Sequence, residues 1–152
     1  MNYFLRGAYL LKCLQWRISR PIKVGVRLML IQDGRVLLVK HTYLPGWYFT
    51  GGGPEKGETL EEAARREAHE EVGAQLGELR LFGVYTHFIG GKTDHIAVFV
   101  CEDFTWSGKK DFEIEEVRFF NVAHLPEDLA PGQERRIQEY LAGSPGLRFG
   151  RW

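Results

Sequence analysis

Three glutamates in one predicted helix are the residues of this chain best suited to chemistry. Glu67, Glu70 and Glu71 stand at i, i+3 and i+4, which places them within an arc of about 100° on a helix. Like charges at this spacing repel, and the edge of an apolar stripe raises their desolvation cost. A divalent cation would remove both penalties, and carboxylate oxygens are the ligands that Mg²⁺ or Mn²⁺ prefers. The alternative is a solvated acidic face, which is common on glutamate-rich helices.

The helix that carries these glutamates has clear end signals. Thr59 is a good N-cap, and Glu62 three residues later completes a capping box. Gly73 supplies the left-handed residue expected just past a helix C-terminus. Glycines 51–53 precede the helix and let the backbone pass close to a metal site without a Cβ in the way. The predicted apolar stripe consists of Leu60, Ala63, Ala64, Ala68 and Val72.

The spacing of this stretch resembles a known signature. Residues 52–74 read GGPEKGETLEEAARREAHEEVGA, with glycine, glutamate and the REAHEEVGA segment in fixed register. This pattern resembles the Nudix box of the Nudix hydrolase superfamily, whose members include the MutT-like enzymes. Every charged and glycine position is filled, and only Ala68 and Ala74 are smaller than the usual aliphatic residues. A looser likeness extends from about Val24 to Leu129.

The resemblance implies both a fold and an activity. The fold is an α/β/α sandwich, in which a mixed sheet lies between helices and the box forms a loop–helix–loop. The activity is that of a Mg²⁺-dependent pyrophosphohydrolase, with Mn²⁺ as a possible substitute. Such an enzyme cleaves a nucleoside diphosphate linked to another moiety by attack of water on phosphorus.

The predicted metal ligands lie in the box. Glu67, Glu70 and Glu71 supply carboxylates, and the resemblance adds the backbone carbonyl of Gly52. Arg66 lies one helical turn from Glu70 and is predicted to position the carboxylates; an ordinary surface ion pair is the alternative.

The general base has two candidates. Family members take it from the box or from a later loop, so either Glu67 or Glu113 is expected to accept the proton of the attacking water. Glu116 is the second choice in the acidic segment after residue 112, and a solvated acidic loop is the alternative for both.

Four further side chains are candidates for substrate binding. Arg27 and Lys40 lie in predicted strands, and His87 and His95 flank a Gly90-Gly91 turn. Solvated strand charges and structural histidines are the alternatives. Some dinucleoside polyphosphate and ADP-ribose hydrolases carry a Tyr or Pro fifteen to eighteen residues past the box. Residues 89–92 here are Ile-Gly-Gly-Lys, so neither assignment is supported.

The elements around the box follow from periodicity and turn signals. Alternating apolar residues predict strands, Asp33-Gly34 and Gly90-Gly91 predict tight turns, and Gly143 and Pro145 end a helix. We expect a loop at 104–112, a helix over 133–141, and strands over residues 24–30, 35–41, 79–88 and 93–103. Residues 113–121 are expected to be an acidic segment that leads into a further strand.

We divide the chain into an N-terminal helix (1–20), a Nudix domain (21–143) and a C-terminal tail (144–152). In the helix, Phe4, Leu11, Leu14 and Ile18 fall on one stripe with Leu10 beside it, and no acid is present. This pattern predicts packing on the chain's own domain or across a homodimer. The alternatives are a basic amphipathic helix on a membrane surface and a signal peptide.

Composition limits the partners. The chain has 152 residues, 20 basic and 20 acidic, and no apolar run long enough to span a membrane. Without an overall basic field, nucleic acid is an expected partner only as an RNA 5′ end. The two cysteines, Cys13 and Cys101, make a disulfide framework implausible and suit the cytoplasm.

Three other functions remain open. The first is an RNA 5′-end pyrophosphohydrolase, and the lack of an overall positive charge argues against this function. The second is a Nudix domain that binds a nucleotide to regulate a partner without turnover, although such a module needs no three repelling carboxylates. The third is a scaffold with an acidic helix and no ligand. The moiety linked to the nucleoside diphosphate is not determined by these residues.

Overall fold

The computed structural model describes residues 3–143 and 146–152. Its elements, in chain order, are α1 (Tyr3–Ser19), β1 (Ile22–Gln32), β2 (Arg35–His41), β3 (Trp47–Tyr48), α2 (Leu60–Val72), β4 (Ala74–Leu76), β5 (Arg80–Ile89), β6 (Lys92–Cys101), β7 (Phe104–Trp106), β8 (Ile114–Asn121), α3 (Pro131–Leu141) and β9 (Arg148–Arg151).

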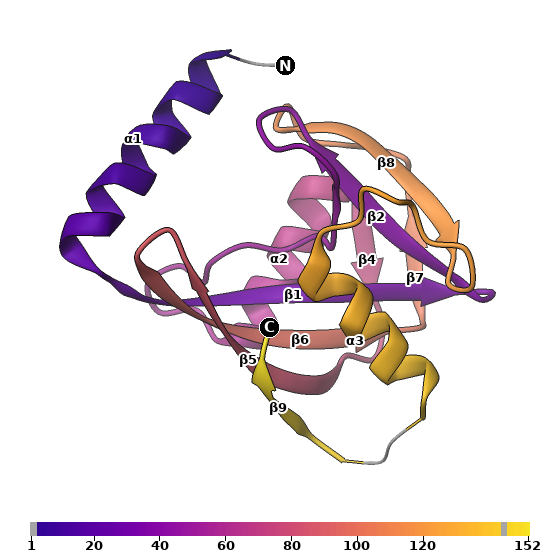
Figure 1. Ribbon diagram of the computed structural model, residues 1–152. Helices are drawn as coiled ribbons and strands as arrows, with labels where there is room; N and C mark the ends of the chain where they lie inside the picture. Colours follow the sequence, from indigo (N-terminus) through magenta and orange to yellow (C-terminus); the bar gives the residue numbers. More distant parts are fainter. Residues whose placement is uncertain (1–2, 144–145) are drawn as a thin grey trace.

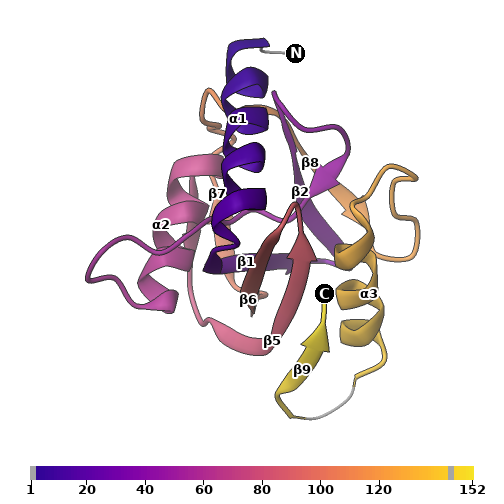
Figure 2. The ribbon, with the colours of Figure 1, turned by 60° about the vertical axis from the view of Figure 1, so that its left-hand side comes forward.

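A mixed sheet forms the centre of the molecule (Figure 1). Its strand order is β3-β2-β1-β6-β5-β9, with β8 also paired to β2. The β1–β6 and β5–β9 pairs are parallel, whereas the other pairs of this sheet are antiparallel. In Figure 2, α2 and α3 lie on opposite sides of the sheet. The expected α/β/α sandwich with a mixed sheet is confirmed.

Alternation along the strands produces one core on each face of the sheet. On β1, Leu28 belongs to the cluster that includes Ala64 of α2, whereas its neighbour Met29 belongs to the cluster that includes Ile137 of α3. Successive strand side chains point to opposite faces, so β1 supplies both cores. Both strand residues are fully buried, which fixes the sheet between the two helices.

The ends of α2 are as predicted. The Thr59 hydroxyl accepts from the backbone N–H of Glu62, and the Glu62 carboxylate accepts from the backbone N–H of Thr59 at 2.8 Å. Gly73 ends the helix in the left-handed region with φ 66°. The predicted stripe is buried, apart from Leu60, which is partly buried against the same core. These contacts fix which turns of α2 carry Glu67 and Glu71.

Residues 146–152 of the expected C-terminal tail include a strand. Strand β9 pairs with β5, and the backbone N–H of Trp152 donates to the Thr86 carbonyl at 3.0 Å. A Cβ on Gly83 of β5 would lie 2.5 Å from the Arg148 carbonyl oxygen, so this glycine permits the close approach. Residues 144–145 of the expected tail lie outside the described residues.

Two smaller boundaries also differ. The expected loop 104–112 contains the short strand β7, which pairs with β4 in a separate two-stranded sheet. Helix α3 begins at Pro131 rather than residue 133, with proline at the first helical position, where its missing N–H removes no helical hydrogen bond.

Helix α1 is present, but its apolar stripe does not pack on the domain. The side chains of Phe4, Leu11 and Ile18 are 82%, 71% and 82% exposed. Tyr9 and Trp16, on the other side of the helix, face the domain instead. Among the described residues, no helix is both long and apolar enough to cross a membrane.

Candidate active site

A cavity of about 740 Å³ brings the predicted acidic residues together with side chains from distant parts of the chain. Gly52, Glu67 and Glu71 line its acidic end, and Glu113 joins them from the segment just before β8. Arg27 of β1 and His87 of β5 also line it. The structure therefore places the box, the later acidic segment and two of the four predicted substrate-binding residues around one space.

Glu71 is the most enclosed of the box carboxylates. Its Oε2 accepts from the backbone N–H of Gly51 at 2.9 Å and from the hydroxyl of Thr50. Burial raises the pKa of Glu71 to about 7, and the two hydrogen bonds oppose that rise without cancelling it. A bound cation would offset the free-energy cost of keeping the buried carboxylate of Glu71 ionised.

Arg66 holds the neighbouring carboxylates. Its Nη1 donates to Glu67 Oε1 and to Glu70 Oε2, each at 3.0 Å, and its Nε donates to Glu58 Oε1 at 2.9 Å. These hydrogen bonds, the one to Glu58 first, raise the pKa of Arg66. Burial raises the pKa of Glu67 in turn, and Arg66 opposes that rise. The contacts are those that a positioning role for Arg66 requires.

The predicted ligand Glu70 differs from the other two box glutamates. Its carboxylate is turned outward to Arg66, its side chain is 56% exposed, and it is not among the described residues that line the cavity. Glu67, by contrast, is 14% exposed. The i+3 position places Glu70 at the outer edge of the same helical arc.

The donors at the acidic end fit a hard divalent cation. A Cβ on Gly52 would lie 2.3 Å from Glu67 Oε1, so only glycine leaves room for this carboxylate against the loop backbone. The carboxylates of Glu67, Glu71 and Glu113 and the carbonyl of Gly52 are all oxygen donors, as Mg²⁺ prefers. Within the described chain, no three Asp, Glu, His or Cys side chains already converge on one ion position.

Comparison with known proteins identifies the family of this chain. The NUDIX domain model matches residues 20–140. The chain belongs to the Nudix family. An ADP-ribose pyrophosphatase of Methanocaldococcus jannaschii is 32% identical over 137 residues, covering 87% of this chain and 80% of the relative. An RNA pyrophosphohydrolase of Aeromonas hydrophila is 27% identical over 121 residues, covering 80% of this chain and 63% of that protein.

The solved structures agree. The MutT NUDIX hydrolase from Burkholderia pseudomallei superposes with a TM-score of 0.71 at 26% identity, covering 77% of this chain and 96% of that one. Together with the family match, this makes the chain a MutT-like Nudix hydrolase, an enzyme that acts on phosphoanhydride bonds.

Two predicted substrate-binding residues of this Nudix hydrolase lie elsewhere. Among the described residues that line the cavity, His41 is present but the adjacent Lys40 is not; Asp94 is present but the adjacent His95 is not. Successive strand residues face opposite sides of the sheet, which separates His95 from Asp94. Lys40 and His41 lie at a register shift in the β2–β8 pair. The His95 Nδ1 instead lies 3.1 Å from the Thr86 hydroxyl.

His41 is a polar group in a poorly solvated place. Burial, together with the positive charge of Arg27, lowers its pKa to about 4. Its Nδ1 is buried without a hydrogen-bond partner among the described residues. The imidazole is therefore neutral at physiological pH and presents a ring to the cavity.

The sequence analysis missed the basic and aromatic walls. Lys92 of β6 lies with its Nζ 4.6 Å from the centre of the Trp16 ring and pairs with Asp94 at 2.6 Å. Tyr9 of α1 lies 6.0 Å from Tyr43, measured between ring centres. All five line the cavity. In β6, Ile96, Asp94 and Lys92 alternate along the strand, and this alternation was a signal that Lys92 and Asp94 lie on the same face. No local sequence signal indicated that α1 reaches the site.

Thr50 is a second omission. Its hydroxyl donates to Glu71 Oε2, so the residue contributes directly to the setting of a predicted metal ligand.

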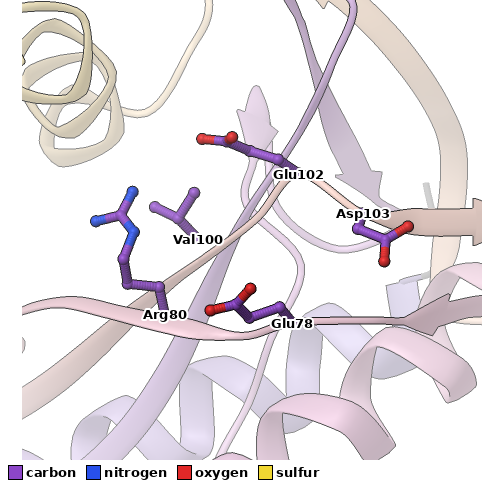
Figure 3. A pocket seen from close by; sticks show the side chains of 5 residues that line it. All are labelled: Glu78, Arg80, Val100, Glu102 and Asp103. Carbon is purple, nitrogen blue, oxygen red and sulfur yellow. The ribbon is translucent and has the colours of Figure 1, made fainter.

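A second, smaller hollow of about 380 Å³ lies apart from these residues (Figure 3). It is lined by Glu78, Arg80, Val100, Glu102 and Asp103. In Figure 3 the carboxylate of Asp103 points away from those of Glu78 and Glu102, and that of Glu102 accepts from the Tyr140 hydroxyl at 2.6 Å. The larger cavity is therefore the candidate active site.

Proposed function

We propose that this enzyme is a Mg²⁺-dependent pyrophosphohydrolase that cleaves a nucleoside diphosphate linked to another moiety. One observation carries the proposal: the cavity that Glu67 and Glu71 line continues into basic and aromatic walls. A nucleoside diphosphate derivative has the matching parts, because its phosphates are anionic and its base is a flat ring.

The box residues hold the metal in this proposal. The carboxylates of Glu67 and Glu71 and the carbonyl of Gly52 bind it, and Glu70 joins them if Arg66 releases its carboxylate. When bound, Mg²⁺ neutralises phosphate oxygens and lowers the pKa of the attacking water. Mn²⁺ has the same preference for oxygen ligands and is expected to substitute.

The protein's own residues then direct hydrolysis. A water oxygen forms a bond to phosphorus, and the bond from that phosphorus to the bridging oxygen breaks, leaving two phosphate-terminated products. Either Glu67 or Glu113 accepts the proton of the water, because both carboxylates line the cavity. Arg66 holds Glu67 in place through its Nη1 contact.

The remainder of the cavity accommodates the rest of the substrate. Arg27, Lys92 and Arg135 line it and offer positive charge to the phosphates. Tyr9 and Tyr43 supply aromatic surface against which a base can pack. The volume of about 740 Å³ lies within the range of ligand pockets. The name of the archaeal relative makes ADP-ribose the first compound to try.

A substrate panel tests this function. The purified full chain is incubated with Mg²⁺ and with ADP-ribose, NADH, dinucleoside polyphosphates, dNTPs, oxidised dNTPs and 5′-triphosphate RNA, and products are separated by chromatography. We expect cleavage at a phosphoanhydride bond of a nucleoside diphosphate derivative. Absence of product with every member, at enzyme concentrations near those of substrate, contradicts the proposal.

Activity on an RNA 5′ end is the second candidate. The name of the Aeromonas hydrophila relative favours it, whereas the balanced charge of this chain gives no general attraction for the RNA backbone. Preference in the panel for 5′-triphosphate RNA over every small nucleotide would replace the first function by this one.

We also propose that the enzyme works in the cytoplasm. Cys13 and Cys101 are both free, and Cys101 is buried in a core strand. Free thiols suit a reducing compartment. Localisation of the tagged full chain by cell fractionation checks this, and recovery of the protein from an oxidising compartment contradicts it.

A further inference from the structure

The outer face of α1 is apolar and exposed. Phe4, Leu11, Leu14 and Ile18 are 60% to 82% exposed, and Leu10 beside them is 59% exposed. In Figures 1 and 2, no other element lies on the side of α1 that is turned away from the sheet. We call these five residues the outer stripe. Such a contiguous apolar stripe is unusual on a soluble surface and marks an interaction site.

The opposite side of the helix fixes its orientation. Tyr9 packs near Tyr43, and the Trp16 ring lies beside Lys92. A Cβ on Gly91, at the β5–β6 turn, would lie 2.8 Å from the Arg17 Cα, so the turn and the helix backbone approach closely. Tyr9 and Trp16 lie on the side of the helix opposite the outer stripe. The helix therefore cannot rotate to bury the outer stripe without breaking these contacts.

The charges that flank the stripe have one sign. At about 100° per residue, Arg6 and Arg17 project on one side of the outer stripe and Lys12 on the other. The first acidic residue of the chain is Asp33, although the whole chain has no net charge. Positive charge is therefore concentrated on α1. Long basic side chains beside an apolar face can reach lipid headgroups while the apolar residues enter the acyl region.

We propose that α1 lies in the surface of an anionic lipid bilayer, with the outer stripe inserted and the Nudix domain held against the membrane. A second copy of the chain is less suited as the occupant. Packing two outer stripes together would bring Lys12 and Arg17 near the same residues of the partner, and α1 has no acid to offset that repulsion. Anionic lipid supplies negative charge.

This surface is independent of the proposed chemistry. The five residues of the outer stripe do not line the cavity described above, so membrane binding and hydrolysis can succeed or fail separately. Membrane binding is therefore measured without any substrate.

The test is vesicle sedimentation of the full-length protein. One set of vesicles is phosphatidylcholine alone, and the other contains about one third phosphatidylglycerol. The fraction bound gives a partition coefficient for each set of vesicles. We expect this coefficient to be at least about tenfold higher on the anionic vesicles than on phosphatidylcholine alone, and to fall as the salt concentration is raised. The double variant Leu11→Glu, Ile18→Glu should lower that coefficient by at least about tenfold.

A matched variant controls for exposed apolar surface in general. Phe149 of β9 is 90% exposed but lies outside α1, so Phe149→Glu should bind as the wild type does. Circular dichroism and thermal melting verify that both variants fold. Equal binding of the α1 variant and the wild type, or no binding to anionic vesicles, overturns the proposal. A dimer in sedimentation velocity that the α1 variant dissociates, without vesicle binding, assigns the outer stripe to a second copy instead.

Discussion

At the scale of single residues, the acidic end of the cavity solves a problem of repulsion. Arg66 donates hydrogen bonds to Glu67 and Glu70 and so offsets their negative charge. The carboxylate of Glu71 instead accepts from the Gly51 amide and the Thr50 hydroxyl. The three carboxylates are thus separated between two sets of donors. A bound cation would take the place of these donors at the carboxylates.

The pKa of Glu71 predicts how its replacement changes stability. The pKa rises from 4.5 to about 7 on folding, so this group's stabilising contribution is full below pH 4.5 and is lost as pH rises through 7. In EDTA at pH 8, Glu71→Gln should therefore be as stable as the wild type, or more stable by up to about 3 kcal/mol. Urea denaturation measures this. A variant destabilised by more than about 1 kcal/mol would mean that the ionised carboxylate stabilises the fold.

His41 predicts a pH dependence of the opposite sign. Its pKa falls from 6.5 to about 4 on folding, so the unfolded chain takes up a proton first as the solution is acidified. Stability should decrease as pH falls from about 6.5 to about 4, by up to about 3 kcal/mol. In His41→Phe this part of the pH dependence should disappear in urea denaturation. An unchanged profile would show that His41 is solvated in the folded enzyme.

At the scale of elements, the features that sequence predicted are those set locally. The capping box and Gly73 determine the ends of α2 from residues within one turn. Asp33-Gly34 and Gly90-Gly91 likewise determine two hairpins. Strands β4, β7 and β9 were missed because they are short and their pairing partners are distant in sequence. The sequence pointed to Lys40 and not to its neighbour His41, because alternation gives the period of a strand but not which side chains face a cavity.

The capping box provides a prediction for α2. Thr59→Ala should destabilise the protein by about 1 kcal/mol, because the backbone N–H of Glu62 loses its acceptor. The double variant with Glu62→Ala should cost less than the sum of the single changes, since each residue bonds the other. Chemical denaturation of the three variants forms the cycle. Additive costs would indicate that the two hydrogen bonds act independently.

At the scale of the whole molecule, the active site is assembled from the entire chain. Tyr9 near one end and Trp152 at the other line the same cavity as the box. The sequence singled out Gly52, Glu67 and Glu71 as predicted metal ligands because they lie in one short motif, and all three line the cavity. It did not identify Tyr9 or Trp152, because their places depend on how α1 and β9 pack on the sheet.

Metal binding should stabilise the whole fold. Mg²⁺ or Mn²⁺ that binds only the folded enzyme raises the melting temperature in proportion to the logarithm of its concentration. We expect such a rise in the wild type and little or none in Glu71→Gln. Ca²⁺-free buffers with EDTA give the baseline. A variant that responds to metal as the wild type does would place the metal away from Glu71.

The most direct test of the central claim is hydrolysis by wild type and Glu71→Gln, each with Mg²⁺ and with EDTA, on the best substrate of the panel. The account predicts turnover only in the wild type with Mg²⁺, with a loss of at least about a thousandfold in the variant. Melting curves that match in EDTA would exclude unfolding as the cause. Turnover by the variant near the wild-type rate, or equal turnover in EDTA, would contradict a metal-dependent Nudix site at Glu71.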